Sequence, residues 1–133
     1  MTPAADIKQR VEAYYVTVSA GDIDSVAAMF TPAATMRDPV GAPPACDDAA
    51  RRQRYAGIRL AFDAFAIAAR TIIVGGDEAA AAWIARATAK DGRAVEFSGI
   101  STFVFDAEGR ITAMSAYLDL TQAAAAASGS ASQ

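Results

Sequence analysis

Histidine is absent from this chain of 133 residues, and cysteine occurs only once, as Cys46. Without histidine the chain cannot form a Ser-His-Asp or Cys-His nucleophile, and a histidine-ligated zinc or iron site is excluded as well. A single cysteine can form neither an internal disulfide nor a thiolate cage, so we expect a cytoplasmic protein without a bound metal. Acid–base chemistry would have to come from carboxylates, tyrosines, lysines or bound water.

Long apolar runs and dense clusters of charge are missing as well. Hydrophobic residues make up 53% of the chain, yet no run approaches the roughly 18 consecutive apolar residues of a membrane-spanning helix. Residues 1–6 contain no basic segment followed by an apolar stretch, so we expect no secretory signal. The net charge is −3 and no dense basic run occurs. We therefore expect neither nucleic acid nor a membrane as a partner.

The first half of the chain has the periodicity of helices. Apolar side chains recur at helical spacing over residues 4–19, which predicts an amphipathic first helix that ends at Gly21. Asp22 then has the character of an N-cap, and we expect a second helix over residues 23–30. The Thr-Pro pair at positions 31–32 ends this second helix.

A short strand and a third helix follow. Residues 34–37 are predicted to form the strand, and Asp47 or Asp48 is predicted to cap the helix, which ends between residues 62 and 65. The cluster of arginines at positions 51–54 lies within this helix, and we expect it to form a solvated face.

The second half of the chain has a period of two. It predicts four longer strands joined by turns rich in Gly and Asp, at residues 67–74, 79–89, 94–105 and 111–120. Helices followed by antiparallel strands indicate a single α+β domain over residues 1–121, in which the helices cover one face of a curved sheet to form a half-open cone. Residues 122–133 are of low complexity, and we expect them to form a frayed tail.

A carboxylate and two tyrosines are candidates for a functional site. Asp38 precedes Pro39, and a proline disfavours the helical region for the residue before it. The carboxylate is therefore held at the end of a short strand, which suits a proton-shuttling base and equally suits a turn residue that caps its own backbone. Tyr14 lies on the apolar stripe of the first helix, where a core tyrosine is the alternative, and Tyr55 lies in the third helix.

Two of the strands have apolar faces that a pocket would need. One face of the strand at 94–105 and one face of the strand at 111–120 are apolar, apart from the hydroxyl of Ser101. These faces carry Phe97, Gly99, Ser101, Phe103 and Phe105, and Met114, Ala116, Leu118 and Leu120.

Over residues 7–120 the chain resembles the ketosteroid isomerases, within the larger NTF2-like (SnoaL-like) superfamily. The resemblance rests on Tyr14, the segment Ala-Gly-Asp-Ile-Asp at 20–24, the segment Asp-Pro-Val-Gly at 38–41, Tyr55 and the order of the elements. It implies an NTF2-like cone with three N-terminal helices on a curved, mostly antiparallel sheet. It also implies a homodimer that pairs through the exposed face of the sheet.

The resemblance also implies roles for particular residues. Asp38 would be the base that takes a proton from the carbon next to a ketone, Tyr14 would donate to the enolate oxygen, and Tyr55 would orient Tyr14. The family's protonated aspartic acid is replaced by Ser101, and losing one oxyanion donor typically costs roughly 100- to 1000-fold in rate. The pocket would be lined by Val18, Phe30, Val40, Trp83, Phe97, Phe103, Met114, Ala116 and Leu118.

These features predict a cofactor-independent isomerase that acts on a small apolar molecule, such as a steroid-like or enone compound. A polyketide cyclase of the same fold would use a similar single carboxylate and a polyketide-like ligand, so it stays open. An epoxide hydrolase of the fold would need an Asp-Arg-Asp set, and no second aspartate accompanies Arg86 convincingly. A non-catalytic domain that binds small molecules is the third alternative, since fold alone does not fix function.

Overall fold

A computed structural model describes residues 3–118 as an open sheet covered by helices on one face. The elements follow the order α1 (Ala4–Ala20), α2 (Ile23–Ala28), β1 (Phe30–Arg37), α3 (Asp48–Ala61), β2 (Phe62–Gly75), β3 (Glu78–Ala89), β4 (Ala94–Phe105) and β5 (Ile111–Leu118). The last two residues of the strand expected at 111–120 and the tail expected at 122–133 lie outside the described residues.

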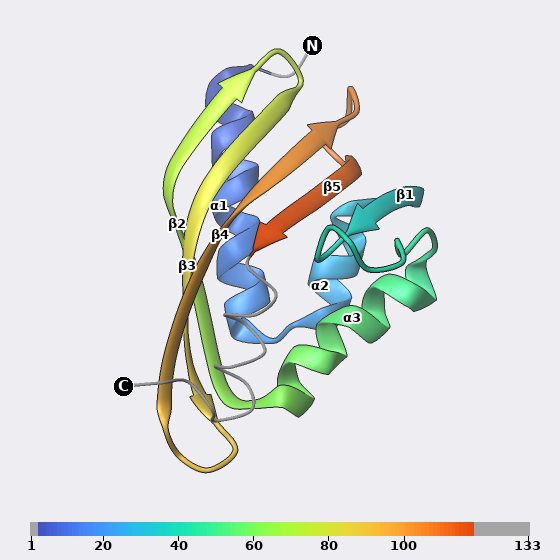
Figure 1. The fold of residues 1–133 in the computed structure, drawn as a ribbon. Coiled ribbons are helices and arrows are strands. Elements are labelled where there is room, and N and C mark those ends of the chain that lie inside the picture. The colour runs from blue at the N-terminus through green and yellow to red at the C-terminus, as the bar shows by residue number, and fades with distance from the viewer. Residues whose placement is uncertain (1–2, 119–133) are drawn as a thin grey trace.

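The sheet has the strand order β1-β5-β4-β3-β2. Neighbouring strands pair antiparallel, except that β1 pairs parallel with β5. Figure 1 shows β2, β3 and β4 as long bent strands, with α1 along one face and α3 beyond the end of α1. This arrangement confirms the α+β cone with three N-terminal helices on a curved, mostly antiparallel sheet.

Helix α1 is held on the sheet by one apolar stripe. Ile7, Val11, Tyr14 and Tyr15 are buried, and their spacing of four, three and one residues places them on one face of a helix. The helix ends at Gly21, whose φ of 72° is a left-handed value that glycine adopts without strain. Asp22 then caps α2, as predicted, by accepting a hydrogen bond from the backbone N–H of Ser25 at 3.1 Å.

Helix α2 is shorter than expected, because Phe30 belongs to a strand. The helix ends at Ala28, and β1 begins at Phe30 rather than at residue 34. Pro32 was interpreted as the end of a helix, but it lies within β1, which is an edge strand. An edge strand tolerates proline, and the register of β1 against β5 is irregular between Phe30 and Thr35.

Helix α3 also passes directly into a strand. It ends at Ala61, and β2 begins at Phe62, five residues before the predicted start at 67. The start of β2 pairs with the end of β3, where Phe62 lies opposite Ala89 and Phe65 lies opposite Ala87. Tertiary pairing with β3 therefore overrides the local pattern of residues 62–66.

The arginine cluster of α3 is divided between core and surface, which corrects the expectation of one solvated face. Arg51 is only 1% exposed. Its guanidinium donates to the carbonyl groups of Ala34 at 2.6 Å, Thr31 at 3.1 Å and Pro32 at 3.2 Å. Because the pairing of β1 is irregular, its backbone needs other partners, and Arg51 supplies them. Arg52 fits the prediction, since it pairs at the surface with Asp24 and Asp48, and Gln53 is exposed as well.

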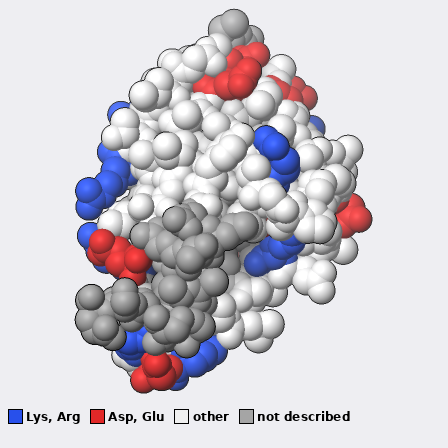
Figure 2. Space-filling view, in the orientation of Figure 1, with Lys and Arg blue, Asp and Glu red and all other residues white. Residues whose placement is uncertain are grey.

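The visible surface bears no concentrated charge. On the face drawn in Figure 2, basic and acidic side chains are scattered among uncharged ones. The outer face of the sheet carries exposed apolar side chains, of which Ile100 and Tyr117 are paired neighbours on β4 and β5. Within residues 3–118, none of the helices is long and apolar enough to cross a membrane.

Candidate active site

A cavity of about 450 Å³ lies between the helices and the covered face of the sheet. Its wall is mostly apolar, and it has the size and character of a site for a small molecule. The polar groups on the wall come from α1, the loop after β1, α3 and β4, and they belong to Tyr14, Tyr15, Asp38, Arg54, Tyr55 and Ser101.

The loop that carries Asp38 is fastened at several points. At its base, Met36 and Ala45 exchange two backbone hydrogen bonds of 2.8 Å. In its middle, the backbone N–H of Val40 donates to the carbonyl of Ala116 on β5 at 2.9 Å. The Asp38-Pro39 peptide bond is cis. The backbone at Asp38 is thus held by the sheet rather than left to solvent.

Arg54 of α3 also fastens this loop. One guanidinium nitrogen donates to the backbone carbonyl of Asp38 at 2.9 Å, and another donates to the carbonyl of Pro43. The guanidinium therefore bridges both sides of the turn. It also places a positive charge beside the carboxyl group of Asp38, which the apolar wall surrounds.

The carboxyl group of Asp38 is tuned by these two surroundings. Burial raises its pKa to about 6, and the charge of Arg54 acts in the opposite direction, lowering it. Burial disfavours the charged form of an acid, and a nearby cation favours that form. The group is therefore mainly ionised at neutral pH, yet it is more basic than an ordinary aspartate. Such a pKa suits a general base that works near neutrality.

Tyr14 and Tyr55 form a buried pair of phenols beside this carboxyl group. Their hydroxyl oxygens are 2.7 Å apart, and either one can donate. Burial is the main cause that raises the pKa of both hydroxyls, and the charge of Asp38 raises them further. Both phenols are thus neutral hydrogen-bond donors at working pH. When Tyr55 donates to Tyr14, the proton of Tyr14 is left for a ligand.

The phenol pair rests on two buried phenylalanines. The ring of Tyr14 meets Phe103 and Phe30 edge to face, with ring centroids 5.3 and 6.5 Å apart. The ring of Tyr55 also contacts Phe30 in a tilted arrangement, with ring centroids 6.5 Å apart. Edge-to-face pairs of this kind favour one ring orientation. The hydroxyl of Tyr14 is therefore held in a defined place.

Comparison with known proteins agrees with this fold. The family model described as "SnoaL-like domain" matches residues 11–114, which is most of the chain. The chain belongs to the SnoaL-like family. A curated relative of this SnoaL-like domain is the steroid Delta-isomerase of Nocardioides simplex, which is 33% identical over 118 residues. The match covers 86% of this chain and 90% of that relative.

Two solved structures that share this fold are an enzyme and a ligand complex. The epoxide hydrolase/cyclase-like enzyme SalBIII, which has a role in pyran ring formation in the polyether salinomycin, is 28% identical with a TM-score of 0.83. That match covers 92% of the SnoaL-like domain and 97% of SalBIII. TerC, co-crystallised with polyporic acid, is 14% identical with a TM-score of 0.80, over 92% of this chain and 98% of TerC. At that identity the likeness to TerC concerns the fold alone.

Most of the site residues predicted from sequence meet at this one cavity of the SnoaL-like domain. Its wall includes Asp38, Tyr14, Tyr55 and Ser101, together with the expected apolar residues Val18, Trp83, Phe97, Met114, Ala116 and Leu118. Three residues expected on the wall are elsewhere. Phe30 and Phe103 are buried in the core against Tyr14, and Val40 lies in the loop, tied by its backbone to Ala116.

Sequence reasoning missed Tyr15 and Arg54. Tyr15 is 3% exposed and lines the cavity. Its position four residues after Val11 indicates that it lies on the buried face of the helix. Of the neighbouring residues Tyr14 and Tyr15, only Tyr14 was assigned a functional role from the sequence. Arg54 was assigned to a solvated face because arginine clusters are usually solvated. Its place beside Tyr55, with Arg51 three residues earlier, is the signal for an inward direction.

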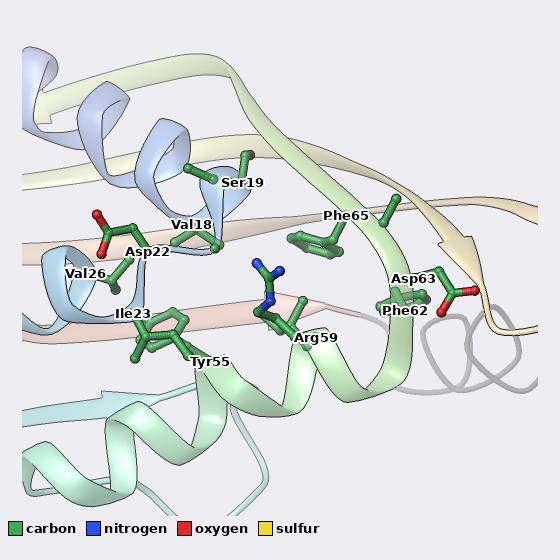
Figure 3. A pocket seen from close by; sticks show the side chains of 14 residues that line it. Val18, Ser19, Asp22, Ile23, Val26, Tyr55, Arg59, Phe62, Asp63 and Phe65 are labelled. Atoms are coloured by element: carbon green, nitrogen blue, oxygen red, sulfur yellow. The ribbon is translucent and has the colours of Figure 1, made fainter.

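A second hollow of about 310 Å³ adjoins the cavity. Figure 3 shows the guanidinium of Arg59 reaching from α3 toward the end of α1, between Val18 and Phe65. A Cβ atom at Gly21 would meet the end of the Arg59 side chain, so a substitution there would require the guanidinium to move. The two spaces share five wall residues, which are Val18, Tyr55, Ile58, Phe62 and Phe65.

The acids and cysteine of the SnoaL-like domain are otherwise spread apart. Over the described range 3–118, no three of them gather in a way that would hold a metal ion. Among the residues on the cavity wall, Asp38 is the one carboxylic acid. Arg86, considered for an Asp-Arg-Asp set, pairs with Glu96 through exposed side chains. It is not on the wall of the cavity.

Proposed function

We propose that this protein is a ketosteroid-isomerase-like enzyme that moves a double bond by proton transfer next to a ketone. The observation that carries the proposal is that the Asp38 carboxyl and the Tyr14 hydroxyl lie on the wall of one apolar cavity. Removal of a proton beside a carbonyl requires a base within reach of that proton. It also requires a hydrogen-bond donor at the oxygen that becomes negative.

Asp38 acts as the base. Its carboxylate takes a proton from the carbon between the ketone and the double bond, which leaves a dienolate and a neutral carboxyl group. The same carboxyl group returns the proton two carbons along, which brings the double bond into conjugation with the ketone. Because the pKa of Asp38 is raised to about 6 by burial, the group accepts and releases the proton without a large energy difference.

Tyr14 stabilises the dienolate. Its hydroxyl, held by the 2.7 Å contact with Tyr55, donates a hydrogen bond to the oxygen of the substrate. A buried donor that is fixed before the reaction is worth far more than one in water. Tyr55 is a positioning residue, since it acts through Tyr14. Neither step uses a cofactor.

The substrate is a flat, fused-ring or enone compound. Apolar wall residues such as Phe65, Phe97 and Leu118 surround the space around the acid and the phenols. The similarity to the steroid Delta-isomerase of Nocardioides simplex favours a 3-keto-Δ5-steroid-like substrate. Exclusion of water from such a site strengthens the hydrogen bonds to the dienolate.

Incubation with 5-androstene-3,17-dione tests the proposal. We expect absorbance of the conjugated enone to grow with the wild-type protein, to be lost with Asp38→Asn and to be slowed with Tyr14→Phe. Growth that is unchanged in Asp38→Asn would contradict the assigned base. A phenolic steroid that binds tightly without any turnover of the dione would instead indicate a non-catalytic binding domain.

A polyketide cyclase is the second candidate. It is favoured by the likeness to SalBIII, an epoxide hydrolase/cyclase-like enzyme with 28% identity. A cyclase would use Asp38 as its acid–base group in the same cavity. A protein that neither isomerises the dione nor binds the phenolic steroid would support this reading. An epoxide hydrolase is less favoured, because Asp38 is the one acid among the described wall residues.

A further inference from the structure

The hydroxyl of Tyr15 is buried without a hydrogen-bond partner in the part of the chain that the structure describes. The residue is 3% exposed and lines the same cavity as Asp38 and Tyr14. An unpaired buried hydroxyl is costly to the folded state, so most such groups in native proteins have a partner. A ligand that supplies an oxygen atom to this hydroxyl would remove the cost.

Ser101 lies beside this phenol and is itself held from the opposite side. Its oxygen accepts a hydrogen bond of 2.9 Å from the indole N–H of Trp83. Because the indole is only a donor, Ser101 retains its own proton and can donate it. Although no hydrogen bond of ordinary geometry joins Ser101 to Tyr15, the serine is near enough to lower the pKa of Tyr15, against the larger raising effect of burial.

The indole of Trp83 is fixed in place by its neighbours. Trp83 lies opposite Gly99 in the register of β3 and β4. A Cβ atom at Gly99 would be 2.5 Å from the indole and 2.5 Å from the carbonyl oxygen of Tyr117. Phe97 meets the indole edge to face at 6.1 Å. Glycine at 99 therefore lets the indole lie close to β4, where its N–H reaches Ser101.

We propose that Tyr15 and Ser101 form a second donor pair that binds the same ligand oxygen as Tyr14, with Trp83 as the residue that positions Ser101. This inference rests on the proposed function and adds specificity for a ligand whose oxygen carries negative charge. The rings of Tyr14 and Tyr15 are 5.0 Å apart, so the two phenols approach the cavity from the same turn of α1. Ser101 stands opposite Ala116 on the neighbouring strand, where a small side chain leaves room for an oxygen atom.

Binding of 2-naphthol and of naphthalene, measured by calorimetry on the full chain, tests the pair. The two molecules share their rings, but only 2-naphthol has an oxygen. In Tyr15→Phe we expect 2-naphthol to bind about tenfold or more weakly, since a hydrogen bond to a charged or polarised oxygen is lost. Naphthalene should bind as it does to the wild type. The matched control is Tyr117→Phe, which removes a phenol oxygen from a half-exposed side chain.

Thermal unfolding separates this role from a structural one. Because the hydroxyl of Tyr15 has no partner within residues 3–118, its removal should leave the melting temperature of the free protein unchanged or raise it. An affinity for 2-naphthol that stays within twofold of the wild type would overturn the proposal. So would an equal loss for naphthalene, which would indicate a change in the shape of the cavity rather than a lost hydrogen bond.

Ser101→Ala supplies a second, independent variant. It should weaken 2-naphthol binding severalfold and should also lower the melting temperature, because the indole N–H of Trp83 then lacks its partner. The control is Ser98→Ala on an exposed position of the same strand. Unchanged 2-naphthol affinity in Ser101→Ala would contradict the pair.

The proposed function and this inference can fail separately. A wild-type protein that does not isomerise 5-androstene-3,17-dione, but binds 2-naphthol in a manner that depends on Tyr15, would remove the isomerase and keep the donor pair. Isomerisation that depends on Asp38 and Tyr14, with 2-naphthol binding unaffected by Tyr15→Phe, would remove the donor pair and keep the isomerase.

Discussion

The two walls of the cavity differ in what they present to a ligand. The helices and the loop after β1 supply most of the polar groups, among them Tyr14, Asp38 and Tyr55. The strands supply mainly apolar surface, with Ser101 as the main exception. Helix α3 is joined to α1 by the Tyr14–Tyr55 hydrogen bond and to the loop by the hydrogen bonds of Arg54. We propose that the helix wall performs the proton transfer and that the sheet wall, apart from Ser101, holds the ligand.

This division predicts that Asp38→Asn has the largest effect on activity. Loss of a general base typically lowers a rate by about 100- to 10,000-fold, and we expect kcat for isomerisation to fall within that range. The measurement is enone absorbance under single-turnover conditions. The control is Glu96→Gln, which neutralises an exposed acid on the outer side of the sheet. If kcat of Asp38→Asn falls by less than tenfold, a residue other than Asp38 is the base.

The same variant should be more stable than the wild type at neutral pH. The pKa of Asp38 is about 6 in the folded protein and 3.8 as an ordinary carboxyl group. The folded state therefore binds more protons between these values, so wild-type stability falls as the pH rises from about 4 to about 6. We expect the free energy of unfolding of Asp38→Asn to exceed that of the wild type by about 2 kcal/mol at pH 7, because the side chain is half-buried and solvent reduces the full effect of the pKa shift.

Denaturant unfolding at pH 4 and pH 7 measures this difference. The gain in stability should be present at pH 7 and mostly lost at pH 4, because the wild-type carboxyl is then protonated in the folded state and about half protonated in the unfolded state. A gain of equal size at both pH values would show that burial of charge is not its cause.

Removal of the Tyr14 hydroxyl is predicted to slow the reaction more than removal of the Tyr55 hydroxyl. Tyr14→Phe should slow isomerisation by about 100-fold or more, since it removes the donor to the dienolate. Tyr55→Phe should slow it by about tenfold, because Tyr14 remains and loses only its orienting hydrogen bond. Single-turnover rates of both variants, with Tyr117→Phe as the matched control, test the order. Equal losses, or a larger loss at Tyr55, would contradict the roles assigned to them.

On the apolar part of the sheet wall, substitutions should change binding rather than chemistry. Leu118→Ala should raise KM by about five- to tenfold and leave kcat nearly unchanged, because it removes apolar contact made equally by substrate and transition state. Leu60→Ala on α3, where the side chain is 77% exposed, is the matched control. A fall in kcat at Leu118 would mean that the sheet wall takes part in the chemistry.

Arg54 neither transfers the proton nor lies on the apolar sheet wall. Its substitution should have the smallest effect on activity. Its charge lowers the pKa of Asp38, so Arg54→Gln should raise that pKa and move the rising limb of the pH–kcat/KM profile to higher pH. Arg54→Lys retains the charge, and its profile should stay near that of the wild type. A profile that moves equally in both variants would indicate that loop geometry, rather than charge, sets the pKa.

The sequence predicted the helix wall better than the element boundaries. Tyr14, Asp38 and Tyr55 were identified because proline restricts the backbone at Asp38 and because the tyrosines resemble a known pattern. The start of β1 was missed because Pro32 is usually a breaker, and only its place at the sheet edge makes it acceptable. The start of β2 depends on pairing with β3, which no local pattern contains.

Contacts distant in sequence account for the remaining differences. Arg51 points inward because its guanidinium donates hydrogen bonds to three carbonyl groups of β1. These groups are 17 to 20 residues from Arg51 in the sequence. Phe30 and Phe103 were expected on the cavity wall but lie behind Tyr14. Periodicity shows that such residues face inward, but it does not distinguish a wall from the core beneath it.

A crystal structure of the protein with a bound phenolic steroid is the most direct test of the claim that one cavity serves both the acid and the phenols. We predict that the phenolic oxygen lies within hydrogen-bond distance of the Tyr14 hydroxyl, that the fused rings rest against the sheet wall, and that the Asp38 carboxyl lies over a neighbouring ring carbon. A steroid bound elsewhere, or one whose oxygen points away from Tyr14 toward the cavity mouth, would contradict the account.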